Sequence, residues 1–221
     1  MRVALVPVKE LRRAKRRLAP LLSPEERWAL SLVMLQDTLA ALSNVEGLNR
    51  LAVVTSDQTV VELARKAGAI VIQEDEQRSE RHSVDQAADI LKARGARSLL
   101  VIPADAPFCS GGEVRCLLEK AAAEPSITLV PSRDGKGTNA ILKSPPDVIP
   151  SRFGYDSLRA HIAEARKRGV SYEILELPSL SLDIDEVEDL LLFAQEASET
   201  ETYRVLVGMG VLERRHASPS A

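Results

Sequence analysis

The sequence predicts an α/β fold, in which a mostly parallel, doubly wound sheet carries an added hairpin. Short apolar runs rich in valine alternate with helix-like stretches through the first half of the chain. In the second half, two strand-like runs flank a turn that contains glycine. With right-handed crossovers, the alternation covers both faces of one sheet with helices.

The first half begins with the apolar run MRVALVPV at residues 1–8, which is typical of a strand buried on both faces. A helix follows, with Ser23 as its N-cap, Pro24 at its first position and Glu26 closing a capping box. It runs to about Ser43. The next elements are predicted in alternation, as strands at 48–57, 69–73 and 98–107 and as helices at 58–67 and 84–94.

The second half starts with the runs 126–132 and 139–145, which predict two strands around the turn RDGKGT. The remaining elements are predicted as a helix from Asp156 or Ser157 to Gly169, short strands at 171–178 and 181–185, and a helix at 186–197. No repeat or linker divides the chain, so we expect one domain over 1–212 and a frayed polar tail over 213–221.

Composition narrows the function classes. A formal net charge of -3 argues against a dedicated nucleic-acid binder. The N-terminus lacks the apolar run of a signal peptide, and no apolar stretch approaches the roughly 18 residues of a membrane span. Cys109 and Cys116 are too few for a disulfide framework. We therefore expect a cytoplasmic protein with reduced cysteines and with neither a membrane nor a nucleic acid as partner.

A cluster of cations follows the first strand, namely Lys9, Arg12, Arg13, Lys15, Arg16 and Arg17. As a helix, this segment has one narrow apolar stripe of Leu11, Ala14 and Leu18, and a solvated helix face is one interpretation. The other is a ligand site, because ligands bind at the carboxyl ends of strands in such folds. Glu10 is the only acid before Glu25, so the field is not neutralised locally. Several cations in one cleft would suit a triphosphate.

Three aspartates are candidate metal ligands. Asp105 ends the strand at 98–107, while Asp183 and Asp185 alternate along an extended segment and so face one side. Together they offer the oxygen ligands that Mg²⁺ prefers, with nucleotide phosphates completing the shell. The alternative is structural, with Asp105 forming a turn and the other two capping a turn and a helix.

A third element joins the turn DGKGTN to the stretch FGYDS. A glycine-bearing turn and a helix start would form a modest anion site, suited to a small phosphorylated acid. His161 lies one turn after Ser157 and could reach this site, although a structural role is the alternative. Because ligands bind at the carboxyl ends of strands in such folds, we expect one cleft to be formed by this turn, the cationic loop, the segment PADAP and the segment LDID.

These stretches resemble a known family. PVKELRRAKRRLAPLLSPEER, VIPADAP, VPSRDGKGTNAIL, FGYDSLRAHIAEA and LDIDEVEDL are similar to the guanylyltransferases of coenzyme F-420 biosynthesis, from about Arg2 to Phe193. The resemblance implies a nucleotidyltransferase fold of the glycosyltransferase-A type. It also implies transfer of GMP from GTP to the phosphate of a three-carbon acid, with release of pyrophosphate. That acid is 2-phospho-L-lactate, phosphoenolpyruvate or 3-phospho-D-glycerate, depending on the member.

Residue by residue, Thr138, Gly154 and Ser157 match the family's phosphoacid-binding positions, and Lys9, Lys15 and Arg17 match its nucleotide loop. One stretch departs from the family. Where it usually has Gly-Leu-Asn, this chain has Ser83, Val84 and Asp85. Asp85 could accept hydrogen bonds from the N1–H and amino groups of guanine, or it could be a helix N-terminal acid without a ligand.

The implied chemistry needs no general base, because a substrate phosphate is already ionised near neutral pH. Mg²⁺ on the aspartates, with Asp105 as the catalytic ligand, would polarise the α-phosphate. Lys15 and Arg17, with Lys9, would neutralise the departing pyrophosphate. The sequence names neither the acid nor the oligomeric state.

Two rival functions remain. A molybdopterin guanylyl- or cytidylyltransferase usually opens with a glycine-rich loop, whereas PVKELRRAKRRL contains no glycine. A non-catalytic nucleotide- or RNA-binding module would leave the three aspartates unexplained.

Overall fold

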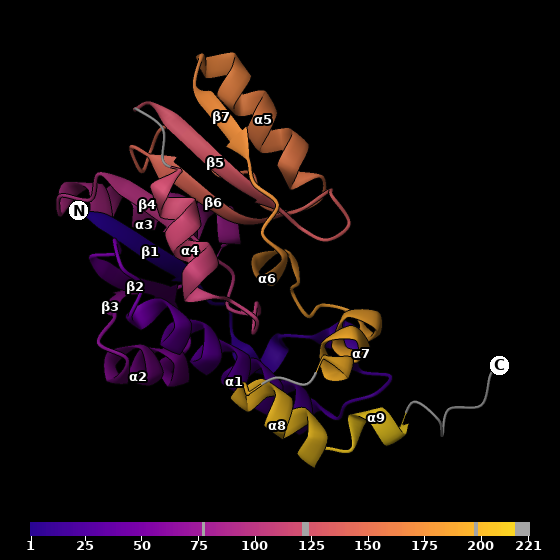
Figure 1. Ribbon diagram of the computed structural model, residues 1–221. Coiled ribbons are helices and arrows are strands. Elements are labelled where there is room, and N and C mark those ends of the chain that lie inside the picture. The colour runs from indigo at the N-terminus through magenta and orange to yellow at the C-terminus, as the bar shows by residue number, and fades with distance from the viewer. Residues whose placement is uncertain (77, 121–123, 197–198, 215–221) are drawn as a thin grey trace.

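The computed structural model describes residues 1–76, 78–120, 124–196 and 199–214. Its strands form one sheet in the order β3-β2-β1-β4-β6-β5-β7 (Figure 1). Their bounds are β1 Arg2–Pro7, β2 Arg50–Thr55, β3 Ile70–Gln73, β4 Ser98–Val101, β5 Ser126–Pro131, β6 Thr138–Ser144 and β7 Ser171–Ile174. β6 runs antiparallel to β4 and β5, and the other pairs are parallel. The predicted α/β sheet with a hairpin is confirmed, and the hairpin lies within the sheet.

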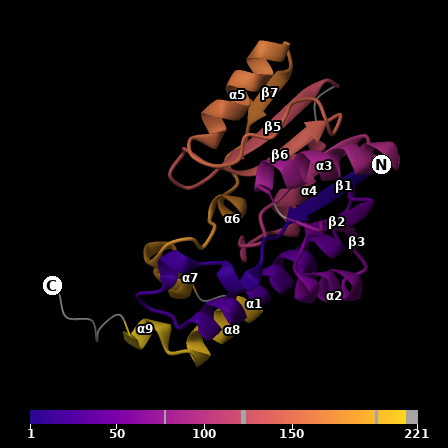
Figure 2. The ribbon, with the colours of Figure 1, turned by 180° about the vertical axis from the view of Figure 1, so that it is seen from behind.

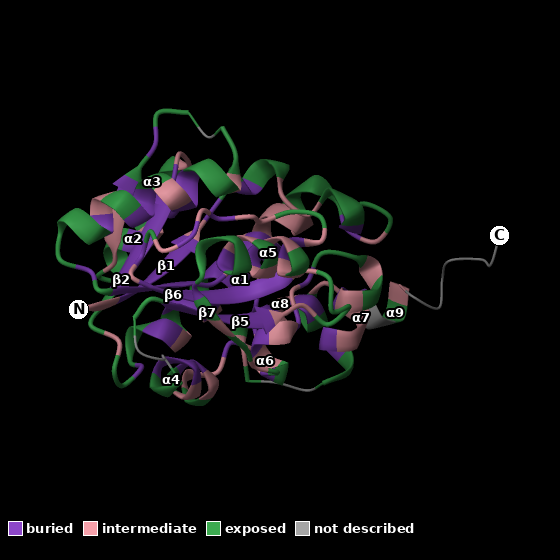
Figure 3. Cartoon of the chain, turned by 90° about the horizontal axis from the view of Figure 1, so that it is seen from above, coloured by how far each residue is buried: buried purple, intermediate pink, exposed green. Residues whose placement is uncertain are grey.

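The helices are α1 Pro24–Ser43, α2 Gln58–Lys66, α3 Glu80–Ala93, α4 Gly111–Glu119, α5 Ser157–Arg168, α6 Pro178–Ser181, α7 Val187–Gln195, α8 Glu201–Gly208 and α9 Val211–Arg214. α1, α2 and α4 pack on one face of the sheet, and α3 and α5 pack on the other (Figures 1 and 2). Alternate residues of β1 serve the two cores: Ala4 and Val6 face α1, whereas Val3 and Leu5 face α3. The strands are therefore buried between helices whose outer faces are exposed (Figure 3).

Helix α1 begins as its sequence predicts. The Ser23 hydroxyl accepts the Glu26 backbone N–H at 3.2 Å, and the Glu26 carboxylate accepts the Ser23 N–H at 2.8 Å. This reciprocal capping box satisfies two backbone donors that the first turn leaves without helical partners.

The cationic segment is not a continuous helix, which corrects the helical interpretation. Two short 3₁₀ turns, Leu11–Arg13 and Arg16–Leu18, flank Lys15, whose φ of 54° places it in the left-handed region. Backbone in that region interrupts an α-helix, because its carbonyl and N–H no longer point along the helix axis. Leu11 and Leu18 are buried as predicted, but from two separate turns.

Two other boundaries differ from the sequence prediction. Helix α3 begins at Glu80 rather than at 84, because the Ser79 hydroxyl caps it by accepting the His82 N–H at 3.2 Å. Residues 182–185 form no strand and follow helix α6 directly. The Ile184 N–H donates to the Asp105 carbonyl at 3.2 Å, so this segment is held against the turn after β4.

The sequence did not predict four of these helices, namely α4, α6, α8 and α9. Asp37 of α1 accepts the backbone N–H groups of Glu201 and Thr202 at 3.1 and 2.8 Å, which fixes the start of α8. Helix α9 contains the first two residues of the predicted tail, and Arg214 pairs with Glu26 at 2.7 Å. Residues 215–221 of that tail lie outside the described residues.

A separate hydrophobic core under the C-terminal helices positions the site. Leu18, from the cationic segment, and Ile184, from the segment before α7, are both fully buried in it beside Phe193. Burial of apolar side chains therefore brings the two charged segments together, although more than 160 residues separate them. No helix of the described part is long and apolar enough to cross a membrane.

Candidate active site

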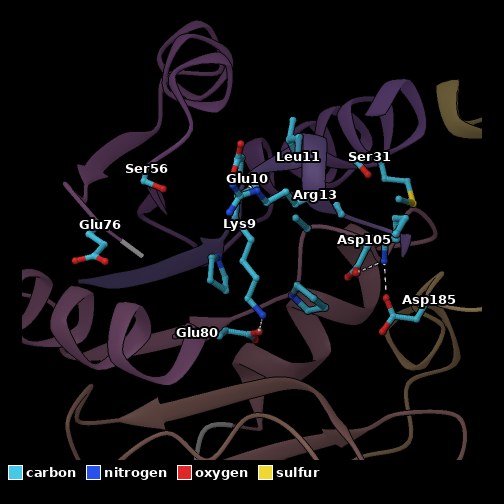
Figure 4. Close-up of a pocket in the computed structure, with 17 residues that line it drawn as sticks. Lys9, Glu10, Leu11, Arg13, Ser31, Ser56, Glu76, Glu80, Asp105 and Asp185 are labelled. Atoms are coloured by element: carbon cyan, nitrogen blue, oxygen red, sulfur yellow. Dashed lines mark hydrogen bonds and ion pairs between the residues drawn. The ribbon is translucent and has the colours of Figure 1, made fainter. Parts of the chain in front are cut away.

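A cavity of about 740 Å³ opens beyond the carboxyl ends of β1 and β4 (Figure 4). The residues after β1 form one wall, and the turn after β4 forms another. Its charged lining includes Lys9, Arg13, Lys15, Glu80, Asp105 and Asp185. Three of the four segments that were predicted to share one cleft therefore line this cavity, whereas the turn DGKGTN does not.

Lys15 lies at the centre of the charged end of this cavity. Its ammonium donates to the Asp105 carboxylate and, at 2.7 Å, to Asp185 (Figure 4). The Lys15 side chain is only 5% exposed. Burial works to lower the pKa of Lys15, but the charges and hydrogen bonds of the two aspartates outweigh it and hold that pKa above its ordinary value. The ammonium is therefore permanently charged.

Asp183 belongs to the same cluster. Burial raises its pKa to about 6, and the nearby charge of Asp105 adds to this rise. Asn139 of β6 opposes this rise in the pKa, because its side-chain amide donates a hydrogen bond to the Asp183 carboxylate at 3.1 Å. Sequence reasoning missed Asn139, although it stands in the quoted turn DGKGTN.

The three aspartates are the candidate metal ligands of this site. Within the described ranges, no three His, Cys, Asp or Glu side chains are arranged to hold a metal ion. Lys15 instead stands between Asp105 and Asp185. The donor set still fits Mg²⁺, which protein sites usually hold by one or two carboxylates, with waters and substrate phosphates as the other ligands.

The cations of the opening cluster, which have few acids near them in the sequence, meet acids from distant parts of the chain. Lys9 pairs with Glu80 at 3.1 Å, and Arg17 pairs with Glu186 at 3.0 Å. Arg17 is 71% exposed and does not line the cavity. The structure thus brings Lys9 and Lys15 to the cavity and places Arg17 on the adjacent surface.

Thr138 and Ser157 lie together, as the resemblance implies. The Thr138 N–H donates to the Ser157 hydroxyl at 2.8 Å, and both residues are buried. His161 Nε2 accepts the Arg152 N–H at 2.9 Å, so its proton is on Nδ1, which lies 3.1 Å from the Thr138 hydroxyl. Burial, with the charge of Lys143, lowers the pKa of His161 to about 4. His161 is therefore a neutral residue that positions Thr138.

Gly154 lines a second, smaller cavity of about 380 Å³. Arg78 and Arg81 line it too, and Lys9 and Glu80 border both cavities. The Arg81 guanidinium donates to the Phe153 carbonyl. A Cβ at Gly154 would stand 3.0 Å from Arg81, and the φ of 118° there also favours glycine. Among the described residues, Arg78 and Arg81 form no ion pair.

Asp85 is not among the residues that line either cavity. Its carboxylate accepts the Ser151 N–H at 2.9 Å and lies 3.6 Å from the ammonium of Lys143, which is fully buried in β6. Because α3 begins at Glu80, Asp85 is also past the first helical turn, so the alternative of a helix N-terminal acid is wrong. Its contacts are those of a residue that stabilises the fold.

Replacing Asp85 with alanine should lower the free energy of unfolding by about 1–3 kcal/mol, because it removes a charged acceptor from a backbone N–H and from a buried lysine. Urea unfolding would measure this change. Asp89→Ala, on the exposed face of the same helix, is the matched control and should change stability by less than about 0.5 kcal/mol. Equal effects of the two variants would contradict the structural role.

The sheet and its charged cavity define the class of protein: the chain has the fold of the nucleotidyltransferases. A crystal structure from Desulfovibrio desulfuricans G20, described as a nucleotide-diphospho-sugar transferase, superposes with a TM-score of 0.78 at 18% identity, over 97% of each chain. A 4-diphosphocytidyl-2C-methyl-D-erythritol synthase superposes with a TM-score of 0.61 at 13% identity, over 87% of this chain and 96% of that one.

The chain belongs to the family described as "Guanylyl transferase CofC like", whose model matches residues 1–220. Phosphoenolpyruvate guanylyltransferase of Roseiflexus castenholzii is 40% identical over 91% of this chain and 92% of that protein. 3-phospho-D-glycerate guanylyltransferase of Colwellia psychrerythraea is 36% identical over 86% and 90%. 2-phospho-L-lactate guanylyltransferase of Methanothermobacter thermautotrophicus is 34% identical over 85% and 81%. The chain is therefore a nucleotidyltransferase of the guanylyltransferase type.

Proposed function

We propose that this protein transfers GMP from GTP to the phosphate of a three-carbon phosphoacid and releases pyrophosphate. The acid is phosphoenolpyruvate, 3-phospho-D-glycerate or 2-phospho-L-lactate, the substrates that the names of its relatives give. We further propose that the reaction requires Mg²⁺ and belongs to coenzyme F-420 biosynthesis. The observation that carries the proposal is the contact of buried Lys15 with Asp105 and Asp185 inside a cavity large enough for a nucleotide.

The step is a substitution at the α-phosphorus of GTP. An ionised oxygen of the acid's phosphate forms a new bond to that phosphorus, and the bond to the bridging oxygen of the β-phosphate breaks. Pyrophosphate leaves with the electron pair, and no proton has to be removed from the attacking group. Catalysis therefore depends on positioning two anions and on stabilising the charge of the leaving group.

Lys15 is the cation best placed for that second task. It is buried, permanently charged and fixed in direction by two carboxylates. A fixed charge in a water-poor site stabilises a developing anion without reorganising at the moment of reaction. Arg13 adds positive charge along the same cavity.

Asp105, with Asp183 or Asp185, would hold the metal ion. These carboxylates already converge on one ammonium or lie within its electrostatic reach. Bound there, Mg²⁺ supplies positive charge at the α-phosphate. Asn139 keeps the Asp183 carboxylate oriented by donating a hydrogen bond to it.

The acid has a matching site in the smaller cavity. Arg78 and Arg81 line it, and the Lys9–Glu80 pair stands between it and the larger cavity. A phosphoacid carries a phosphate and a carboxylate, both of which arginine can bind through paired hydrogen bonds. Gly154 lines this cavity. Thr138 and Ser157 do not line it, and they are joined by the hydrogen bond from the Thr138 N–H to the Ser157 hydroxyl at the start of α5.

A pyrophosphate-release assay tests the proposal, with GTP and Mg²⁺ and each of the three acids in turn, repeated with ATP and with CTP. We expect release with GTP and at least one acid, and none after a chelator removes Mg²⁺. Release with a molybdopterin acceptor alone would favour that rival transferase. Binding of RNA that needs no Mg²⁺ and falls steeply with salt, without any release of pyrophosphate, would favour a binding module.

A further inference from the structure

We propose that the Glu80 carboxylate, with the Lys9 ammonium beside it, selects guanine over the other bases in the larger cavity. This inference deepens the function proposed above and rests on it. It places at Glu80 the contact with guanine that the sequence offered as one of two interpretations of Asp85.

The argument begins with the direction of the nucleotide. Asp105 and Asp185 lie together at one end of the cavity (Figure 4), and Lys15, which bonds to both, is the cation proposed to contact the triphosphate. Ser56 and Glu76 lie toward the opposite end, and the Lys9–Glu80 pair lies between the two ends. A nucleotide whose phosphates contact Lys15 therefore extends its sugar and base toward Glu80.

Guanine and the Lys9–Glu80 pair are complementary in hydrogen bonding. The base presents two adjacent donors, N1–H and the 2-amino group, next to the O6 acceptor. A carboxylate is an acceptor only and can take both donors, whereas an ammonium is a donor only and can serve O6. Adenine and cytosine each place a ring-nitrogen lone pair where guanine has N1–H, so the carboxylate repels them.

Glu80 is the carboxylate best placed for this role. It is the first residue of α3, its side chain is 34% exposed, and Lys9 holds its Oε2 at 3.1 Å. Asp85 bonds to Ser151, and Glu74 is buried and accepts the Ser83 hydroxyl at 2.8 Å. Glu76 is exposed and has no ion pair within the described part of the chain.

The Lys9–Glu80 contact adds little to stability, because both side chains are partly exposed. We therefore expect substitutions at Glu80 to leave the fold intact, which thermal unfolding would verify. An effect on base choice can then be read without interference from unfolding.

The decisive variant is Glu80→Gln, compared with the unchanged protein using GTP and xanthosine triphosphate. Xanthine keeps N1–H but has a carbonyl oxygen where guanine has its amino group. A glutamine amide accepts from N1–H through its oxygen and donates to that carbonyl through its nitrogen. We expect kcat/KM for GTP to fall by about 100-fold and the preference to reverse toward xanthosine triphosphate.

Two further variants separate the role of Glu80 from a general loss of charge. Glu62→Gln, on the exposed face of α2, removes one negative charge from a residue that lines neither cavity and should keep both activity and preference. Glu76→Gln removes the carboxylate that lies toward the end of the cavity opposite Lys15, and it should keep the preference for GTP. Equilibrium binding of each nucleotide, measured without the acid, gives a second readout that does not depend on turnover.

Retention of the GTP preference by Glu80→Gln, or reversal by Glu76→Gln, would overturn the assignment. Failure of the proposed function has a different signature, because the unchanged protein would then transfer no nucleotide to any of the three acids. In that case the binding measurement still decides the role of Glu80, through the relative affinities for GTP and xanthosine triphosphate.

Discussion

Asp105→Asn is expected to lower the turnover number by at least about 10³-fold, a loss of roughly 4 kcal/mol of transition-state stabilisation. The substitution keeps the size of the side chain but removes the charge that Lys15 contacts most closely. It also removes the carboxylate best placed to share a metal ion with Asp183 or Asp185. Steady-state pyrophosphate release at saturating Mg²⁺ would measure the change.

The control for this variant is Asp147→Asn, which changes an aspartate that pairs with Lys92 on the surface. Its turnover should remain within about twofold of the unchanged protein, because surface ion pairs contribute little. Near-normal, metal-dependent turnover in Asp105→Asn would remove Asp105 from the metal site, provided that both variants unfold at similar temperatures.

Lys15→Ala should raise KM for GTP by about tenfold and lower the turnover number by about 100-fold, because removing a preorganised charge commonly costs this much. Lys15 is the one predicted nucleotide-loop cation whose ammonium is both buried and held by two aspartates. Without it, those carboxylates would repel the triphosphate. The separate changes in KM and in the turnover number distinguish binding from stabilisation of the leaving group.

Arg16→Ala is the matched control, since Arg16 is an exposed cation in the same segment and does not line the cavity. We expect its kinetic constants to stay within about twofold. If Lys15→Ala behaved like Arg16→Ala, the buried lysine would be a structural counter-ion and the pyrophosphate would have to be stabilised elsewhere.

Local sequence patterns of several residues predicted the strands and helices of the fold well. The apolar run of β1 and the capping box of α1 are local signals that no tertiary contact opposes. Where two local signals compete, the sequence does not decide between them. The pattern predicted the start of α3 at 84, whereas Ser79 caps the helix, so α3 begins at Glu80 and Asp85 lies past the first turn, where it accepts the Ser151 N–H.

The site was predicted in part, because alternation and strand ends say where side chains gather but not which of them pair. The sequence placed Lys15, Asp105 and Asp185 in one cleft, and the structure joins them. The left-handed backbone at Lys15 could not be foreseen, because lysine has no preference for it. The roles of Asn139 and Glu80 could not be predicted, because they depend on contacts with residues that are distant in the sequence.

Lys15, whose backbone lies in the left-handed region, is held between Asp105 and Asp185, and this contact affects the order in which the enzyme binds its substrates. A divalent ion arriving alone would compete for carboxylates that an internal cation already neutralises. A triphosphate offers that cation an alternative set of oxygens and so frees the aspartates for the metal. We therefore expect magnesium to bind together with the nucleotide. We also expect that a chelator has no effect on the protein when no nucleotide is bound.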